Sequence, residues 1–247
     1  MNIGTYFKTK VDLHWSAAIL ILLSASRMFS YLNLAYAGMF SEFSFLVAST
    51  AFSVGLIFSI IAHEFGHILV GRKHGVEFTG ITIHFLGGAA HMNPNIPNAK
   101  AELWMAAAGP AVSVALFILL LPIAMFYNYL FPTHILVDTV IAATAIVNLA
   151  LAIFNLIPAY PLDGGRILRS IFWLINKNFL KATRWATYVG DGFGAAFVIT
   201  GVMMMFGVKI PLFGQGIGDG IWQVVMGALI IIFANYELNQ YKRDYAR

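Results

Sequence analysis

The stretch FSFLVASTAFSVGLIFSIIAHEFGHILV (residues 43–70) is apolar over nearly its whole length and carries two histidines and a glutamate near its end. A membrane-spanning helix needs about 20 mainly apolar residues, so this segment is long enough to cross a bilayer. Each unpaired ionisable side chain inside the hydrocarbon costs at least about 2.5 kcal/mol on insertion scales. Because His63, Glu64 and His67 lie within five residues, they indicate a functional site.

The composition of the whole chain indicates a membrane protein. Of its 247 residues, 60% are apolar and 11% are charged, and the mean hydropathy is +0.78. An ordinary soluble domain carries about 25% charged residues. The net charge of +4 indicates basic loops on the cytoplasmic side rather than nucleic-acid binding. The chain has no cysteine, so a metal site must use histidine, carboxylate or backbone ligands.

Hydropathy predicts an all-α polytopic membrane protein with about six transmembrane helices in a single domain (residues 1–247). The segment 75–97 alternates in polarity and is broken by glycines and prolines, which predicts short strands or a re-entrant β segment after the second helix. The basic amphipathic segment 167–185 predicts a helix along the membrane interface. We expect neither a removable signal peptide nor a soluble regulatory domain. The predicted spans are about 13–34, 43–70, 101–129, 135–157, 186–206 and 221–238.

Basic residues predict the orientation of these spans. With a cytoplasmic N-terminus, all of the 15 lysines and arginines except Arg27 and Lys209 fall on the cytoplasmic side. The positive-inside rule therefore predicts cytoplasmic N- and C-termini, in what we interpret as a prokaryotic cell membrane. The same topology brings His63 and the sequence PLDGG (residues 161–165) to one membrane depth, roughly 8–14 Å inside the cytoplasmic boundary.

His63 and His67 are four residues apart, so a helix presents both side chains on one face. Two imidazoles in this arrangement can bind one metal ion, and zinc suits a site with an open position for water. Glu64 can take a proton from the attacking water and pass it to a leaving amine. The alternative is a chance match in which these side chains only form interhelical hydrogen bonds.

A catalytic zinc site usually has three protein ligands, so a third residue is needed. His74 reads as a solvated loop residue, and His84 and His91 are alternative ligands. Asp163 is better placed, because two prolines interrupt the fourth helix just before it. Local sequence alone also fits a turn-forming aspartate in front of two glycines.

Four motifs in order carry a family resemblance. AHEFGH (62–67) and NLIPAYPLDGG (155–165) resemble the HExxH and NxxPxxPLDGG motifs of the site-2 protease family of intramembrane zinc metalloproteases. FLGGAA (85–90) is similar to the Gly-Gly strand segment between those motifs, and AAAGPAVS (106–113) to the family's AGP stretch. Ser113 stands where many members have asparagine. The resemblance covers about residues 55–170, and it implies a catalytic core over about 43–170.

The resemblance implies a role for each motif residue. His63, His67 and Asp163 would bind one Zn²⁺ per chain, and Glu64 would act as the general base. Asn155 would lie near the oxyanion of the tetrahedral intermediate, where a neutral donor can stabilise developing charge. A helix-capping or interhelical hydrogen bond is the alternative for Asn155.

The resemblance also implies a way to bind substrate. A helical peptide hides its carbonyl groups, so a substrate segment has to be extended before it is cleaved. A strand edge near Gly87 and Gly88 could pair with that segment. The alternative is that the hairpin only plugs the site.

These observations lead us to expect an intramembrane zinc metalloprotease that hydrolyses membrane-spanning proteins near the cytoplasmic side. Its partners would be a transmembrane protein substrate and the lipid bilayer, with no nucleic acid, and the oligomeric state stays open. One alternative is a membrane transporter or metal permease, whose ligands would spread along a pore. Another is a catalytically inactive relative that binds substrates.

Overall fold

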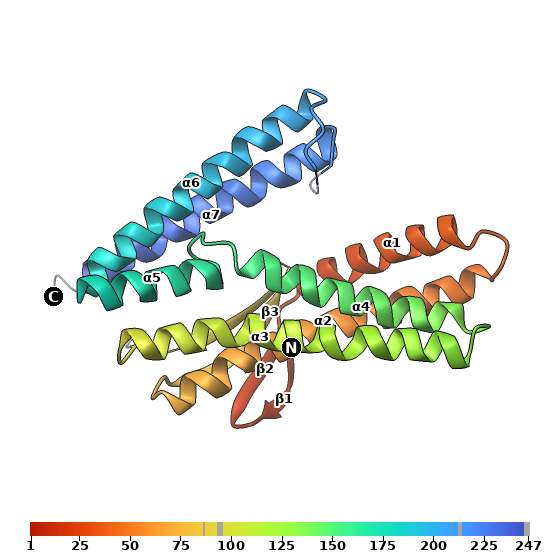
Figure 1. Cartoon of the computed structure of the whole chain (residues 1–247), viewed down its shortest axis with the longest axis horizontal. Coiled ribbons are helices and arrows are strands. Elements are labelled where there is room, and N and C mark those ends of the chain that lie inside the picture. The colour runs from red at the N-terminus through yellow and green to blue at the C-terminus, as the bar shows by residue number, and fades with distance from the viewer. Residues whose placement is uncertain (86, 93–95, 212–213, 245–247) are drawn as a thin grey trace. The chain divides into compact units, whose positions relative to one another are not determined.

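The computed structural model describes residues 1–85, 87–92, 96–211 and 214–244. Within these residues the chain forms a small sheet and seven helices (Figure 1). The strands are β1 (Asn2–Tyr6), β2 (Thr9–Leu13), β3 (Phe78–His84) and β4 (Gly87–Met92). The helices are α1 (Ala17–Ala35), α2 (Glu42–Lys73), α3 (Ala99–Leu130), α4 (Ile135–Asn155), α5 (Asp163–Asn176), α6 (Phe179–Met205) and α7 (Ile217–Asp244).

Six of the helices within the described residues are long and apolar enough to cross a membrane, namely α1, α2, α3, α4, α6 and α7. This confirms the predicted number of helical spans. The first span begins at Ala17 rather than near residue 13, because Leu13 is the last residue of β2. The predicted interfacial segment is divided between α5, which is amphipathic, and the first turns of α6, which begins at Phe179 rather than near residue 186.

The chain divides into two compact units, which we describe separately. The first unit comprises residues 1–97 and 108–154, and the second comprises residues 98–107 and 155–247. Helix α3 therefore contributes its first turns to the second unit and the rest of its length to the first. The prediction of a single protease domain stays a prediction.

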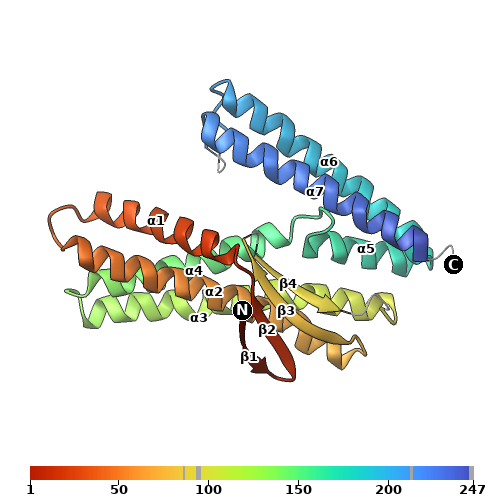
Figure 2. The same cartoon turned by 180° about the vertical axis from the view of Figure 1, so that it is seen from behind.

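The first unit contains the sheet, with strand order β1-β2-β3-β4 (Figure 2). The pairs β1–β2 and β3–β4 are antiparallel, whereas β2 and β3 are parallel. The β3–β4 hairpin confirms the β segment predicted after the second span. Two residues with positive φ, Phe7 and Lys8, form the β1–β2 turn. Arg72, in the last turn of α2, donates hydrogen bonds to both turn carbonyls and so attaches this hairpin to the helix.

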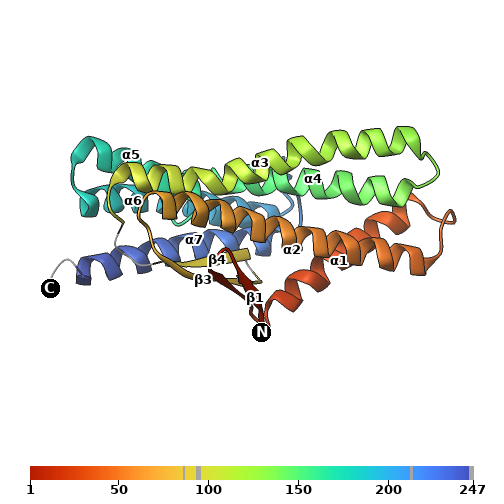
Figure 3. The same cartoon turned by 90° about the horizontal axis from the view of Figure 1, so that it is seen from below.

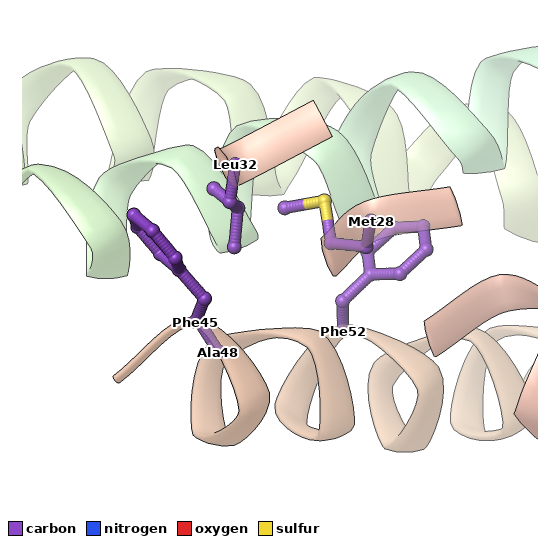
Figure 4. Close-up of a cluster of buried hydrophobic side chains, with 5 residues drawn as sticks. All are labelled: Met28, Leu32, Phe45, Ala48 and Phe52. Carbon is purple, nitrogen blue, oxygen red and sulfur yellow. The ribbon is translucent and has the colours of Figure 1, made fainter. Parts of the chain in front are cut away.

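The helices of the first unit hold α2 from two sides. Phe45, Ala48 and Phe52 of α2 pack with Met28 and Leu32 of α1 in one buried cluster (Figure 4). On the α4 side, the Asn148 amide donates to Ser59 Oγ over 2.8 Å. Such interhelical hydrogen bonds stabilise helix contacts in a membrane. The α2 backbone is therefore fixed close to the point where its ionisable residues begin.

The second unit is built on a close helical hairpin of α6 and α7. Gly194 faces Gly227 and Gly201 faces Gly220, and a Cβ on any of the four would lie 2.5–2.8 Å from a backbone oxygen of the opposite glycine. Small residues let helix backbones approach in this way inside a membrane. Helix α5 packs on α6, next to this helical hairpin.

Candidate metal centre

The first part of the site is the histidine pair on α2. The Nε2 atoms of His63 and His67 are 3.1 Å apart, and the two side chains are only 4% and 5% exposed. Two nitrogens that bind one tetrahedral zinc ion at about 2.0–2.1 Å lie roughly 3.3 Å apart. The pair therefore fits the geometry that one zinc ion requires.

Ser113 on α3 orients the first histidine. Its hydroxyl is 2.9 Å from His63 Nδ1, and both groups are buried. A ligating histidine commonly uses its second ring nitrogen in such a contact, which fixes the ring and the tautomer. This contact leaves Nε2 of His63, the atom nearest to His67, as the nitrogen for a metal.

Gly109 on α3 leaves space beside the histidines, where α2 and α3 run side by side (Figure 3). A Cβ at this position would lie 2.2 Å from His67 Nε2 and 2.6 Å from His63 Nε2. Any side chain at residue 109 would therefore occupy the volume next to both ligand atoms. Glycine at residue 109 keeps this volume free of a side chain of its own.

Glu64, the residue after His63, extends towards the sheet. A Cβ on Gly88 of β4 would lie 2.5 Å from Glu64 Cγ and 2.8 Å from Glu64 Oε1. Gly87, which precedes it, has φ +124°, a conformation that favours glycine, and open space around its Cα. Gly88 therefore lets the β4 backbone approach the carboxylate.

In the second unit, Asp163 is the first residue of α5 and Asn155 is the last residue of α4. The two glycines after Asp163 are required by packing. A Cβ on Gly164 would lie 2.3 Å from the Leu156 carbonyl oxygen, and one on Gly165 would lie 2.2 Å from the Tyr160 nitrogen. The start of α5 therefore rests directly on the segment that links it to α4. The carboxylate of Asp163 also lies in a first helical turn, where the helix dipole favours negative charge.

The structure brings two pairs of predicted residues of the first unit together, His63 with His67 and Glu64 with Gly88. Asn155 and Asp163 belong to the other unit, so their place beside the histidines stays a prediction.

The histidines considered as alternative ligands lie elsewhere in the first unit. The Nδ1 of His74, just after α2, contacts the carbonyl oxygen of Val70, in keeping with an exposed loop residue. The ring of His84 lies 4.9 Å from the ring of His14, and His91 Nε2 contacts Thr82 Oγ1.

Sequence reasoning overlooked the roles of Gly109 and Ser113. The AGP stretch was recognised, but only for its family resemblance. A usable signal was present, since the two residues are four apart on one helix and therefore share a face. The pairing of that face with the histidines depends on how α2 and α3 pack, which no local pattern shows.

Comparison with known proteins shows to which family the chain is similar. The model for peptidase family M50 matches residues 51–138 and 130–199. The chain is 38% identical to a zinc metalloprotease of Methanocaldococcus jannaschii over 151 residues, which are 61% of this chain and 42% of that protein. It is 33% identical to a candidate zinc metalloprotease of Synechocystis sp. over 205 residues, which are 81% of this chain and 51% of that protein. The chain thus spans about half the length of these curated relatives.

A solved structure shows the same fold. The site-2 protease from Methanocaldococcus jannaschii superposes with a TM-score of 0.63 and 24% identity, over 96% of this chain and 94% of that one. Together with six long apolar helices among the described residues, the comparisons identify a multi-pass membrane protein.

Proposed function

Since the chain belongs to peptidase family M50, we propose that it is an intramembrane zinc metalloprotease that hydrolyses peptide bonds of membrane-spanning proteins near the cytoplasmic side. One observation carries the proposal. The Nε2 atoms of His63 and His67 converge beside Gly109, and Glu64 is the residue that follows His63. A purely structural role would not require two buried imidazoles whose Nε2 atoms converge beside a glycine.

We propose that His63, His67 and Asp163 bind one zinc ion per chain. The two histidines offer Nε2 atoms at a suitable separation, and the donor set of two imidazoles and one carboxylate is one that zinc accepts. Asp163 is supported by its place in the NLIPAYPLDGG motif and at the N-terminus of α5. A zinc ion at this position supplies Lewis acidity, which activates water and polarises a peptide carbonyl.

The protein residues supply the proton transfers and the orientation. Glu64 accepts a proton from the attacking water and delivers it to the leaving amine, which suits a carboxylate next to the ligand pair. The Asn155 amide donates to the oxygen on which negative charge develops, a contribution that is large in a site shielded from water. Ser113 keeps the His63 ring in place throughout.

The strand β4 is the proposed binding site for substrate. It lies at one edge of the four-stranded sheet, and Gly88 lies against Glu64. An extended substrate segment that adds to this edge near Gly87 and Gly88 would present its carbonyl groups to the carboxylate. The substrates are therefore membrane-spanning proteins with a segment that can leave the helical state.

The remaining proposals concern location. Basic residues gather at one end of the predicted spans, so we place both termini on the cytoplasmic side of a prokaryotic cell membrane. A transporter or metal permease is not favoured, because the family consists of peptidases.

The test is cleavage of a single-span model peptide by the purified chain in proteoliposomes, with products located by mass spectrometry. The Glu64→Gln variant should keep its zinc but cleave at least about 100-fold more slowly, as expected for loss of a general base. The matched control is Glu77→Gln, the same change at an exposed residue of the first unit, which should cleave like the wild type. Wild-type cleavage rates in Glu64→Gln would contradict the proposal.

A further inference from the structure

The second unit contains a buried ion pair that the proposed chemistry does not use. Arg169 of α5 and Glu102 in the first turn of α3 are both fully buried. The Nε of Arg169 donates to Glu102 Oε1 over 2.7 Å, and its Nη2 donates to the same oxygen. A buried charge is tolerated only when it is paired and hydrogen-bonded, so the two residues depend on each other.

Arg169 has further partners, and they converge on one tyrosine. Its Nη1 donates to the Tyr160 hydroxyl over 2.7 Å, and its guanidinium lies 4.7 Å from the centroid of the Tyr160 ring. The rings of Phe179 and Tyr241 lie 5.0 and 5.4 Å from the same guanidinium. A guanidinium within about 6 Å of an aromatic centroid is attracted by the ring, and more strongly when water is excluded.

Tyr160 is itself fixed at three further points. Its hydroxyl donates to Glu237 Oε2 on α7. Burial raises the pKa of Tyr160 well above its usual value, although the charge of Arg169 opposes this, so the hydroxyl keeps the proton that it donates. Its backbone is enclosed by two glycines, since a Cβ on Gly165 would lie 2.2 Å from its nitrogen and one on Gly190 would lie 2.7 Å from its oxygen.

The hydrogen bonds that join Arg169, Glu102, Tyr160 and Glu237 form a clamp, and Asp163 is three residues after Tyr160. Arg169 is six residues after Asp163, about 9 Å along the axis and about 240° around the helix, so its side chain points away from the carboxylate. Any influence of Arg169 on Asp163 must therefore pass through Tyr160 and the position of α5.

We infer that Arg169, paired with Glu102 and bound to the Tyr160 hydroxyl, is a positioning residue that holds Asp163 where it can bind the metal. This inference rests on the proposed function, in which Asp163 is the third zinc ligand. The contacts anchor the middle of α5 to α3 through Arg169 and the segment before α5 to α7 through Tyr160, so both sides of Asp163 in the sequence are held. Loss of the clamp therefore lets the carboxylate move away from the position that the metal needs.

The experiment measures zinc affinity of the purified full-length chain by competition with a chromophoric chelator, and the visible spectrum after Co²⁺ substitution. Arg169→Gln should bind zinc about 10–100-fold more weakly, the range seen when a supporting partner of a metal ligand is lost. Its Co²⁺ spectrum should resemble that of Asp163→Asn. Arg169→Lys should recover part of the affinity, because lysine restores the charge without the fork of donors.

The control is Gln223→Leu, which removes a 2.8 Å hydrogen bond to Thr200 between α7 and α6 of the same unit. It should alter thermal stability and leave zinc affinity unchanged within about 2-fold. If Arg169→Gln lost no more affinity than this control, or kept the wild-type Co²⁺ spectrum, Arg169 would be only structural and the inference would fail.

Tyr160→Phe decides the question if Arg169→Gln does not fold, because it removes one hydroxyl and keeps the ring. An affinity at least about 3-fold weaker supports the inference, and an unchanged affinity overturns it. A wild-type chain that binds no zinc would instead refute the proposed function. Zinc binding that depends on Asp163 but not on Arg169 or Tyr160 would refute the inference alone.

Discussion

Gly109→Ala is the change whose effect on the metal site follows most directly from the structure. The new Cβ would lie 2.2 Å from His67 Nε2, whereas real Cβ contacts essentially never fall below 3.0 Å. The His67 nitrogen must therefore retreat by about 0.8 Å, which is 3.0 minus 2.2, and metal–ligand distances tolerate only about 0.2 Å. We expect zinc affinity to fall by at least about 100-fold, because the change displaces a ligand rather than a supporting group.

The backbone effect of the same change has the opposite sign. Alanine within a helix is about 0.5–1 kcal/mol more favourable than glycine, so a loss of metal would not arise from a weaker helix. The assay is zinc per chain by plasma mass spectrometry after equilibration with a chelator, alongside thermal unfolding. Gly192→Ala is the matched control, since nothing lies within 4 Å of its Cβ in α6. If Gly109→Ala binds zinc as tightly as this control, the metal does not lie between α2 and α3.

Three further predictions concern the first unit. Ser113→Ala should weaken zinc binding about 10–100-fold, because His63 loses the partner that fixes its ring. Competition with a chelator measures the affinity, and an affinity equal to that of the wild type would contradict this prediction. Gly88→Val should slow cleavage at unchanged zinc content, because the new Cβ would lie 2.5 Å from Glu64 Cγ. An unaltered cleavage rate would show that activity does not need the close approach of the β4 backbone to Glu64. Desolvation and two neighbouring histidines lower the pKa of His84, so the folded state holds this proton less tightly than the unfolded state. The contribution of His84 to thermal stability should therefore be constant above about pH 6.5 and decrease as the pH falls below it. The His84→Asn variant should lose less stability over that range, whereas a pH profile identical to that of the wild type would exclude His84 as the source.

The sequence predicted the helices and the placement of the histidine pair on one helix well, because both depend on local patterns. Long apolar runs define spans by length and hydropathy alone, and the i, i+4 spacing of His63 and His67 already places both on one helix face. The start of α1 was misplaced because β1 and β2 were not foreseen. Strand β2 pairs in parallel with β3, about 70 residues later, and such long-range pairing leaves no local signal.

The supporting residues were harder to predict, because their roles arise from packing between distant segments. The role of Gly109 can be recognised only when the packing of α3 against the histidines of α2 is known. For Arg169 the sequence indicated only a basic residue on the cytoplasmic side, and the structure adds that it is fully buried against Glu102, 67 residues earlier. Two opposite charges in apolar sequence hinted at a buried pair, but nothing in the sequence specified that they would pair with each other.

The central proposal is that His63, His67 and Asp163 bind one zinc ion. The most direct test is X-ray absorption at the zinc edge on the purified, zinc-loaded chain, compared with Asp163→Asn. We predict two imidazole nitrogens and a carboxylate oxygen at about 2.0–2.2 Å in the wild type, and loss of the carboxylate contribution in the variant. A wild-type shell with fewer than two imidazoles, or a shell unchanged in Asp163→Asn, would contradict the account.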